Sequence, residues 1–216
     1  MNIILFGPPG AGKGTQADNI VKSFNLHKIS SGDLLRDEIS KKTTLGTKIK
    51  NLIDKGSFVS DEIINDLILK TLSNKKFSNR LLFDGYPRNI EQAKSLDLLV
   101  EKYNQKISCV LCLNVEKNLL IKRILGRQIC KKWGIIFNKF FKPASSENHS
   151  CGQKYLIQRS DDNETTILHR YNTYIEKTLP IIDYYKKFKL LHEIDGKAEI
   201  DQIFNEIRGI IASLEA

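Results

Sequence analysis

Short apolar runs alternate with amphipathic stretches along most of this 216-residue chain. The apolar runs have the length of buried strands and lie at residues 2–6, 27–30, 80–84, 106–114 and 190–194. Strands that alternate with helices predict a parallel sheet, because a parallel crossover usually contains a helix. We therefore predict an α/β fold in which five parallel strands form the middle of three layers, with helices on both faces.

Helical periodicity fills most of the segments between these runs. It predicts helices at residues 13–24, 32–41, 45–55, 61–72, 90–103, 116–127, 164–188 and 199–214. Residues 128–162 break the alternation, since they contain short β-like pieces at 134–141, then Pro143 and a polar run. A stretch of this length is too long for a simple connection, so we predict a small inserted lid with β structure.

A glycine-rich turn joins the first predicted strand to the first helix. It reads GPPGAGKGT and matches the phosphate-loop spacing G-x4-G-K, with a glycine inserted before the hydroxyl residue. Glycines let backbone N–H groups turn inward around phosphate oxygens, and the helix N-terminus adds positive potential. Lys13 supplies a mobile positive charge. The turn predicts a nucleoside triphosphate site formed by Gly10, Ala11, Gly12, Lys13, Gly14 and Thr15.

The charge balance also favours phosphate-bearing partners. The formal net charge is +9, from 34 lysines and arginines against 25 acidic residues. Most of the basic residues are lysines spread along the whole chain, which favours solvated faces over a nucleic-acid patch. No apolar run approaches the roughly 18 residues of a membrane span. The N-terminal residues are typical of a first strand rather than a signal peptide, so we expect a cytoplasmic protein with reduced cysteines.

Five further segments carry residues suited to nucleotides. They read SSGDLLR at 30–36, GSFVSDE at 56–62, DGYPR at 84–88 followed by Gln92, RILGR at 123–127, and RSDDNE at 159–164 followed by Arg170. Six of the chain's eight arginines lie in these segments, and the planar guanidinium suits bidentate contacts with phosphate. In this order the motifs resemble those of the long-lid adenylate kinase family, nucleoside monophosphate kinases with a phosphate loop. The resemblance covers essentially the whole chain.

The resemblance implies reversible phosphoryl transfer from Mg-ATP to AMP, giving two ADP, with each motif in a stated role. Catalytic roles are implied for Lys13, Asp84, Arg88, Arg123, Arg127, Arg159 and Arg170. ATP contacts are implied for the phosphate loop, Arg123, Arg127, Ile136, Phe137 and the backbone of Ala198. AMP contacts are implied for Ser31, Arg36, Ser57, Phe58, Val59, Gly85, Tyr86, Pro87, Arg88, Gln92, Arg159 and Arg170.

The chemistry of these side chains fits the implied reaction. Phosphoryl transfer needs alignment and neutralisation of charge more than covalent help. Asp84 ends a predicted strand, where a carboxylate can hold the water shell of Mg²⁺. Gln92 offers an amide able to pair with an adenine edge. The nucleophile is an anionic phosphate oxygen, so no general base is required, and none of the four histidines lies in a motif.

The resemblance also implies how the chain is divided. The core is expected at 1–29, 60–126 and 165–216, an AMP-binding helical insertion at 30–59 and the lid at 127–164. Closure of the lid would exclude water, whose attack would waste ATP. We expect a monomer that acts on free nucleotides, without a nucleic-acid or membrane partner.

Two of the four cysteines lie in the predicted strand at 106–114. Cys109 and Cys112 have the C-x2-C spacing of a metal site. A central strand instead predicts two buried, small apolar side chains, and we favour that interpretation.

The other two cysteines lie in the predicted lid, where many members of the family carry a structural zinc site of four ligands. Cys130 and Cys151 stand at two of the ligand positions, but Trp133 and Asn148 occupy the others, with His149 next to Asn148. Two thiolates and one imidazole fall short of four ligands, so we expect that zinc is not bound and that Cys130 and Cys151 are a remnant of the site.

Two alternatives remain open at the level of sequence. A kinase for another monophosphate, such as UMP or CMP, would share the fold, although the long lid and Gln92 favour AMP. A regulatory or nucleic-acid-binding protein that binds a nucleoside triphosphate would use the basic surface, but it would not need Asp84, Arg88 and two lid arginines.

Overall fold

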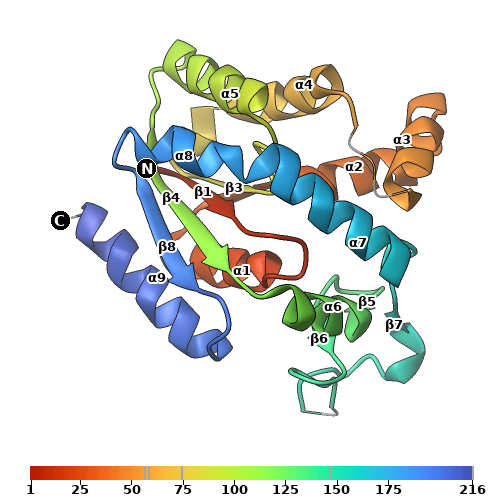
Figure 1. Cartoon of the computed structure of the whole chain (residues 1–216). Helices are drawn as coiled ribbons and strands as arrows, with labels where there is room; N and C mark the ends of the chain where they lie inside the picture. The colour runs from red at the N-terminus through yellow and green to blue at the C-terminus, as the bar shows by residue number, and fades with distance from the viewer. Residues whose placement is uncertain (56, 58, 74, 146, 216) are drawn as a thin grey trace.

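The computed structural model describes residues 1–55, 57, 59–73, 75–145 and 147–215 (Figure 1). Its strands are β1 (Asn2–Phe6), β2 (His27–Ser30), β3 (Leu81–Asp84), β4 (Ile107–Asn114), β5 (Arg127–Cys130), β6 (Ile136–Asn138), β7 (Leu156–Ile157) and β8 (Leu191–Asp195). Its α-helices are α1 (Lys13–Phe24), α2 (Ser31–Ser40), α3 (Thr44–Asp54), α4 (Asp61–Leu72), α5 (Ile90–Lys102), α6 (Lys117–Leu125), α7 (Glu164–Thr173), α8 (Pro180–Lys186) and α9 (Ile200–Glu215). The 3₁₀ turns η1 (Lys75–Phe77) and η2 (Gln153–Tyr155) and the π-helical turn η3 (Tyr174–Thr178) complete the described elements.

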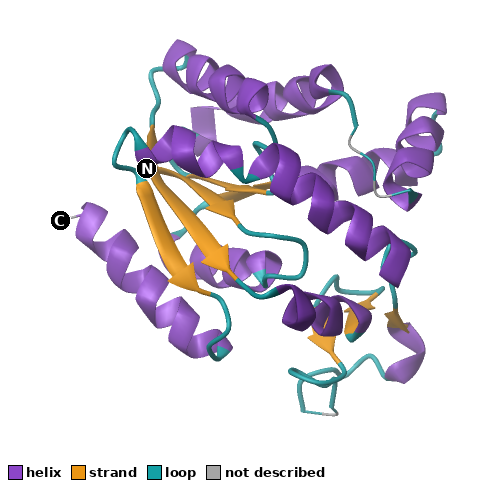
Figure 2. Ribbon diagram, in the orientation of Figure 1, coloured by secondary structure: helices purple, strands orange, loops and turns teal. Residues whose placement is uncertain are grey.

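Five parallel strands form the main sheet, in the order β2-β3-β1-β4-β8, as the sequence predicts. A smaller antiparallel sheet has the order β6-β5-β7 and lies between α6 and α7 in the chain. Figure 2 shows helices on both sides of the main sheet, so its central strands need apolar side chains on both faces. This requirement explains why these strands appear in the sequence as continuous apolar runs.

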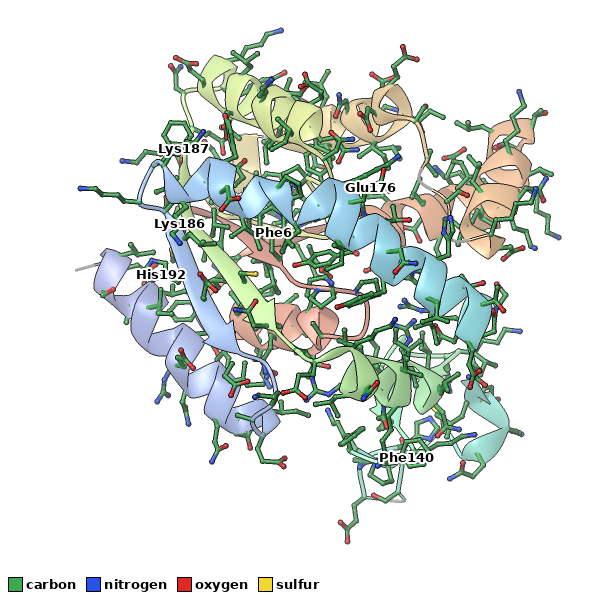
Figure 3. All side chains as sticks on the ribbon, viewed as in Figure 1. Phe6, Phe140, Glu176, Lys186, Lys187 and His192 are labelled. Atoms are coloured by element: carbon green, nitrogen blue, oxygen red, sulfur yellow. The ribbon has the colours of Figure 1, made fainter. Side chains whose placement is uncertain are left out.

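Successive residues of β1 point to opposite faces of the sheet. Ile4 belongs to a core cluster shared with α2, α4, α5 and α8, whereas Ile3 belongs to the cluster shared with α1 and α9. Phe6 lies in the first cluster, and its ring centroid is 6.2 Å from that of Tyr185 on α8 (Figure 3). The two clusters fix the layers and place the carboxyl ends of β1, β3 and β4 at one edge, beside α6 and α7.

One helix ends earlier than predicted, and the arginine pair changes its geometry. The sequence predicts one helix at 116–127 with Arg123 and Arg127 on one face; this is wrong, because α6 ends at Leu125 and Arg127 begins β5. Asn138 of β6 terminates α6, since its Nδ2 donates to the Arg123 carbonyl at 2.7 Å. The end of α6 also depends on a glycine at 126. Any other residue there would bring its Cβ within 2.6 Å of the Phe140 ring, so only glycine fits.

The long helix predicted at 164–188 is divided into α7, η3 and α8. The backbone stays helical at the junctions Thr173 and Leu179, so the three pieces form one helical segment (Figure 1). Pro180 lacks the N–H that an α-helix interior requires and clashes with the preceding turn. The chain responds with the wider π-turn, in which the Leu179 N–H donates to the Tyr174 carbonyl at 2.8 Å.

Several smaller predictions can be compared directly. Cys109 and Cys112 are fully buried in β4, which confirms the interpretation as small apolar side chains. The β-like pieces at 134–141 reduce to the short strand β6. Among the described helices, none combines the length and the hydropathy needed to cross a membrane.

The layered core gives a stability prediction. Leu111 of β4 is fully buried, whereas Leu98 of α5 is 68% exposed. Leu111→Ala should lower the free energy of unfolding by about 2–5 kcal/mol, because it removes buried apolar surface and leaves a cavity. Leu98→Ala is the matched control and should change it by less than about 0.5 kcal/mol. Urea unfolding measures both, and equal losses would contradict the assignment of the core.

Candidate nucleotide site

The glycine-rich turn forms an open phosphate loop between β1 and α1. Gly12 precedes α1 with φ 96°, and no atom lies within 4 Å of the position that a Cβ would occupy there. Gly10 has φ 86°, and a Cβ on it would lie 2.7 Å from Ile124 of α6. No side chain of the described residues caps the N-terminus of α1, so its N–H groups and dipole face the open loop.

Lys13 lies inside this loop, where burial and nearby positive charges disfavour the charged form of its amine. Its Nζ donates to the carbonyls of Gly7 at 2.6 Å and Pro8 at 3.0 Å. Burial lowers the pKa of Lys13 to about 8; Asp84 opposes this shift, while Arg88 and Arg170 add to it. A phosphate beside Lys13 would restore the ordinary preference of the amine for its charged form.

Arg88 is the centre of a second group of contacts. Its Nε donates to the Gly85 carbonyl at 2.7 Å and its Nη2 to the Ser31 hydroxyl at 3.2 Å. The Ser31 hydroxyl in turn donates to the Gly85 carbonyl at 2.6 Å. Burial lowers the pKa of Arg88 to about 10, and the charge of Arg170 adds to the shift. The structure therefore brings Ser31 of α2 and Arg88 together across the sheet edge, 57 residues apart in sequence.

Gln92 is held by the protein itself. Its Oε1 accepts from the Arg88 backbone N–H at 2.7 Å, and its Nε2 donates to Asp61 Oδ1 at 2.6 Å. Asn89 also donates to the Asp61 carboxylate. Asp61 thus orients the Gln92 amide, a role that the sequence did not reveal because Asp61 has the position of a helix cap.

A narrow cavity lies between the helical insertion and the core. It is lined by Ser31, Leu35, Val59, Ile64, Gly85, Tyr86, Arg88 and Gln92. Six of these eight residues were predicted to contact AMP, and Leu35 and Ile64 are additions that only the fold could identify. The cavity holds about 10 Å³, roughly the room of one water molecule.

Three further residues predicted to contact AMP have contacts or surroundings of their own. Arg36 of α2 pairs with Asp33 in the same helix. The Ser57 N–H donates to the Leu52 carbonyl at 2.9 Å, at the end of α3. Pro87 is buried and follows a cis peptide bond. Phe58 lies outside the described residues.

The lid arginines are oriented by two buried aspartates. Arg127 Nε donates to Asp162 at 2.8 Å, and Arg127 Nη2 binds the other oxygen of that carboxylate. Arg170 of α7 pairs with Asp161. Burial lowers the pKa of Arg170, and Asp161 opposes the shift. These bidentate and buried pairs fix each guanidinium and leave its other donors for an anion.

The Nε–H group of Arg159 is a buried hydrogen-bond donor. Its Nε has no hydrogen-bond partner within the described part of the chain. Burial lowers the pKa of Arg159 to about 10, and the charges of Arg127 and Arg36 add to the shift. Asp161 and Asp162 oppose the shift. A buried N–H without a hydrogen-bond partner is costly, and a bound anion would satisfy it.

Arg123 links the phosphate loop to the loop after β8. Its Nη1 donates to the carbonyls of Gly196 at 2.8 Å and Ala11 at 3.4 Å. Its guanidinium carbon lies 5.7 Å from the centroid of the Phe141 ring. Ala198 follows Gly196 by two residues and is half-buried, so the structure places the predicted ATP contacts Arg123 and Ala198 on neighbouring segments.

Two predicted ATP contacts of β6 differ in their surroundings. Ile136 approaches the phosphate loop, since its Cδ1 lies 3.4 Å from where a Cβ on Gly14 would be. Phe137 is 1% exposed, and its ring centroid lies 5.0 Å from that of His149. The Phe137 side chain therefore packs inside the lid and leaves only its backbone for a nucleotide. Thr15, in the first turn of α1, is half-buried.

Asp84 ends β3 beside the cations. Burial raises the pKa of Asp84, while the charges of Lys13 and Lys28 oppose the shift. A buried carboxylate at the carboxyl end of a parallel strand is suited to hold hydrated Mg²⁺, because a nearby cation favours its ionised form. The described residues therefore fit a magnesium ion here.

Two cysteines and one histidine of the segment 127–164 lie close together. The ligand atoms of Cys130, His149 and Cys151 all lie within 4.8 Å of one another. Burial acts to raise the pKa of Cys130, but hydrogen bonds from His149 and from the backbone of Trp133 and Lys132 outweigh it, so the net pKa is lowered.

Among the described residues, this group offers three ligand atoms, fewer than the four that a structural zinc takes. Trp133 has no ligand atom and is 51% exposed. Asn148 Oδ1 accepts from the Ser145 N–H at 2.8 Å, and its Nδ2 donates to the Pro143 carbonyl at 3.0 Å. The amide of Asn148 therefore stabilises its own turn, and the site does not supply the fourth ligand of a structural zinc.

A phosphate loop after the first strand of a parallel sheet, surrounded by lysine and arginine side chains, defines a P-loop nucleotide-binding protein of the phosphoryl-transfer class. The sequence model of one family, described as adenylate kinase, matches residues 5–190.

Full-length relatives agree with that match. The adenylate kinase of Pelagibacter ubique (strain HTCC1062) is 49% identical over 211 residues, which cover 98% of this chain and 99% of the relative. Those of Methanocella arvoryzae (strain DSM 22066) and Enterococcus faecalis (strain ATCC 700802) are 41% and 40% identical over at least 98% of each chain. The chain therefore belongs to the adenylate kinase family of nucleoside monophosphate kinases, whose substrates are ATP and AMP.

The lowered pKa of Lys13 predicts how ATP binding depends on pH. In the free protein the charge of Lys13 is present below about pH 8 and is lost above it. Because bound phosphate favours the charged amine, the Kd for ATP should rise above pH 8, by up to about tenfold per pH unit. Isothermal calorimetry between pH 7 and 9.5 measures this. Lys13→Met should bind weakly with no such dependence; a steep dependence in that variant would contradict the assignment.

Proposed function

We propose that this chain transfers the terminal phosphoryl group of Mg-ATP to AMP by in-line displacement, giving two ADP. The observation that carries the proposal is the convergence of like charges at one sheet edge. Burial lowers the pKa of Lys13, Arg88 and Arg170, and the charge of Arg170 lowers the pKa of both Lys13 and Arg88 further. Such a cluster is unfavourable alone and becomes favourable around a polyphosphate, whose charge grows and shifts in the transition state.

The two nucleotides are assigned to opposite sides of this cluster. ATP is bound by the phosphate loop, Arg123, Arg127 and the backbone around Ala198. AMP is bound in the cavity of α2, α4 and the DGYPR segment, with its phosphate on Arg88, Arg36 and Ser31. The arginines lie between these two sites, so they can stabilise the transferring group without taking a proton from it.

Asp84 would hold Mg²⁺ through the ion's water ligands, and Thr15 offers a further oxygen. When bound, the ion neutralises charge on the phosphates. The charge of Asp84 also favours the charged form of Lys13.

Closure of two inserted segments is part of the proposal. We assign 30–59 to the AMP-binding insertion and 127–164 to the lid, with the core at 1–29, 60–126 and 165–216. The Ser160 hydroxyl donates to Asp54 Oδ1 at 2.8 Å, which joins the two segments. Closure of this kind excludes water, whose attack would hydrolyse ATP. We propose that the protein acts as a cytoplasmic monomer on free nucleotides, without zinc.

The role of Arg88 can be tested with a matched control. Arg88→Ala should lower kcat by about 10²–10³-fold or more, because it removes a positive donor that acts on the transferring group. Arg208 lies exposed on α9 outside every motif, so Arg208→Ala should leave kcat within about twofold. A coupled assay for ADP measures both variants; similar rates for Arg88→Ala and the unmodified protein would overturn the assignment.

The choice of acceptor has its own test. ADP formation from Mg-ATP should be fast with AMP and at least about 10²-fold slower with UMP or CMP, because the site is built to hydrogen-bond one base. Initial rates with AMP, GMP, UMP and CMP at equal concentrations measure this. A preferred pyrimidine acceptor would keep the fold and the mechanism but reassign Ser31 and Gln92.

A further inference from the structure

Two thiols and an imidazole gather in the lid and have no role in phosphoryl transfer. Cys130 ends β5, whereas Cys151 lies just before η2. Their sulfurs and a ring nitrogen of His149 lie within 4.8 Å of one another. Cys130 is fully buried and Cys151 is half-exposed, so only one of the two sulfurs is open to a bulky reagent.

His149 lies buried beside this pair. It is 4% exposed and packs on the ring of Phe137, and its Nε2 has no hydrogen-bond partner among the described residues. The two sulfurs and the imidazole therefore form one compact group next to the small sheet, close enough for chemistry between the thiols.

We propose that Cys130 and Cys151 are a redox modification site that closes to a reversible disulfide within the lid, with a small-molecule disulfide of the glutathione type as the oxidant. The pairing starts from geometry already present, since the two sulfurs lie within 4.8 Å of each other. The described residues bring three ligand atoms together here, one fewer than a structural zinc takes, so we expect no zinc to protect these thiols.

The chemistry balances in two exchange steps. The half-exposed Cys151 sulfur attacks glutathione disulfide, forms a mixed disulfide and releases one glutathione, which takes up the proton that Cys151 loses. The buried Cys130 thiolate then attacks the Cys151 sulfur, forms the Cys130–Cys151 bond and releases a second glutathione as a thiolate. The protein loses two hydrogen atoms, and one glutathione disulfide is reduced to two glutathiones.

The bond would join the two ends of the segment 131–150. Cys130 is paired through β5 with both other strands of the small sheet, and Cys151 precedes β7, so the link ties the loop to the whole sheet. Closing this loop restricts the unfolded lid and should raise its resistance to unfolding. Because Arg127 lies at the other end of β5, oxidation should leave its pair with Asp162 in place.

The test uses the reduced full-length chain and glutathione disulfide, with no nucleotide. After incubation the chain is unfolded in denaturant, the remaining thiols are alkylated with iodoacetamide, and the intact mass and the peptides are measured. We expect two of the four cysteines to resist alkylation, a crosslinked peptide pair that contains Cys130 and Cys151, no retained glutathione, and full reversal by dithiothreitol.

Three variants separate the steps. Cys130→Ser should stop at one glutathione on Cys151, and Cys151→Ser should gain none, because Cys130 is buried. Cys109→Ala, which removes a buried cysteine of β4, is the matched control and should still form the disulfide.

Other outcomes would overturn the proposal. Stable glutathione on Cys151 of the unmodified chain would show that Cys130 cannot reach it. Four alkylated cysteines after exposure to excess glutathione disulfide, or one tightly bound zinc per purified chain, would contradict it as well. Each readout is a mass or a metal content, so its failure is distinguishable from failure of the proposed kinase activity.

Discussion

Positive charge crowded at the carboxyl edge of the main sheet is the constraint on which the site depends. Lys13, Arg88 and Arg170 come from three different segments; burial lowers the pKa of each, and Arg88 and Arg170 add to the shift at Lys13. The carboxylate of Asp84 opposes the shift at Lys13, and that of Asp161 opposes the shift at Arg170. The sheet, the phosphate loop and the long helical segment hold these charges in place, and we propose that a polyphosphate relieves their repulsion.

The layered core could be predicted because strands buried on both faces appear as plain apolar runs. The five strands and most helices of the core were expected within one or two residues. The end of α6 could not be predicted, because Asn138 caps it from a later segment and Phe140 requires a glycine at 126. Local periodicity at 116–127 contains neither contact. Likewise, Pro180 shows that α-helical geometry fails locally, but the π-turn that replaces it depends on packing of the whole segment.

Site residues could be predicted from the sequence where they lie in a motif. Residues whose role depends on contacts made only in the folded chain could not. Ser31 and Arg88 were chosen from separate motifs, and the structure brings them within 3.2 Å. Asp61 was missed because its role is to orient Gln92, and nothing in its own surroundings in sequence distinguishes it from a helix cap. Phe137 was placed at the nucleotide, but its ring completes the lid core, since the lid must bury some aromatic surface of its own.

The central claim is that a polyphosphate spanning both sides of the cation cluster relieves its repulsion. The most direct measurement is the thermal stability of the protein with a bisubstrate analogue that joins two adenosines through a chain of phosphates. Ligands that bind the folded state raise its stability according to their affinity. The account predicts a larger rise in Tm than ATP or AMP gives alone, and the difference should shrink in Arg88→Ala but not in Arg208→Ala. A rise no larger than that of ATP alone, or one that Arg88→Ala leaves unchanged, would contradict it.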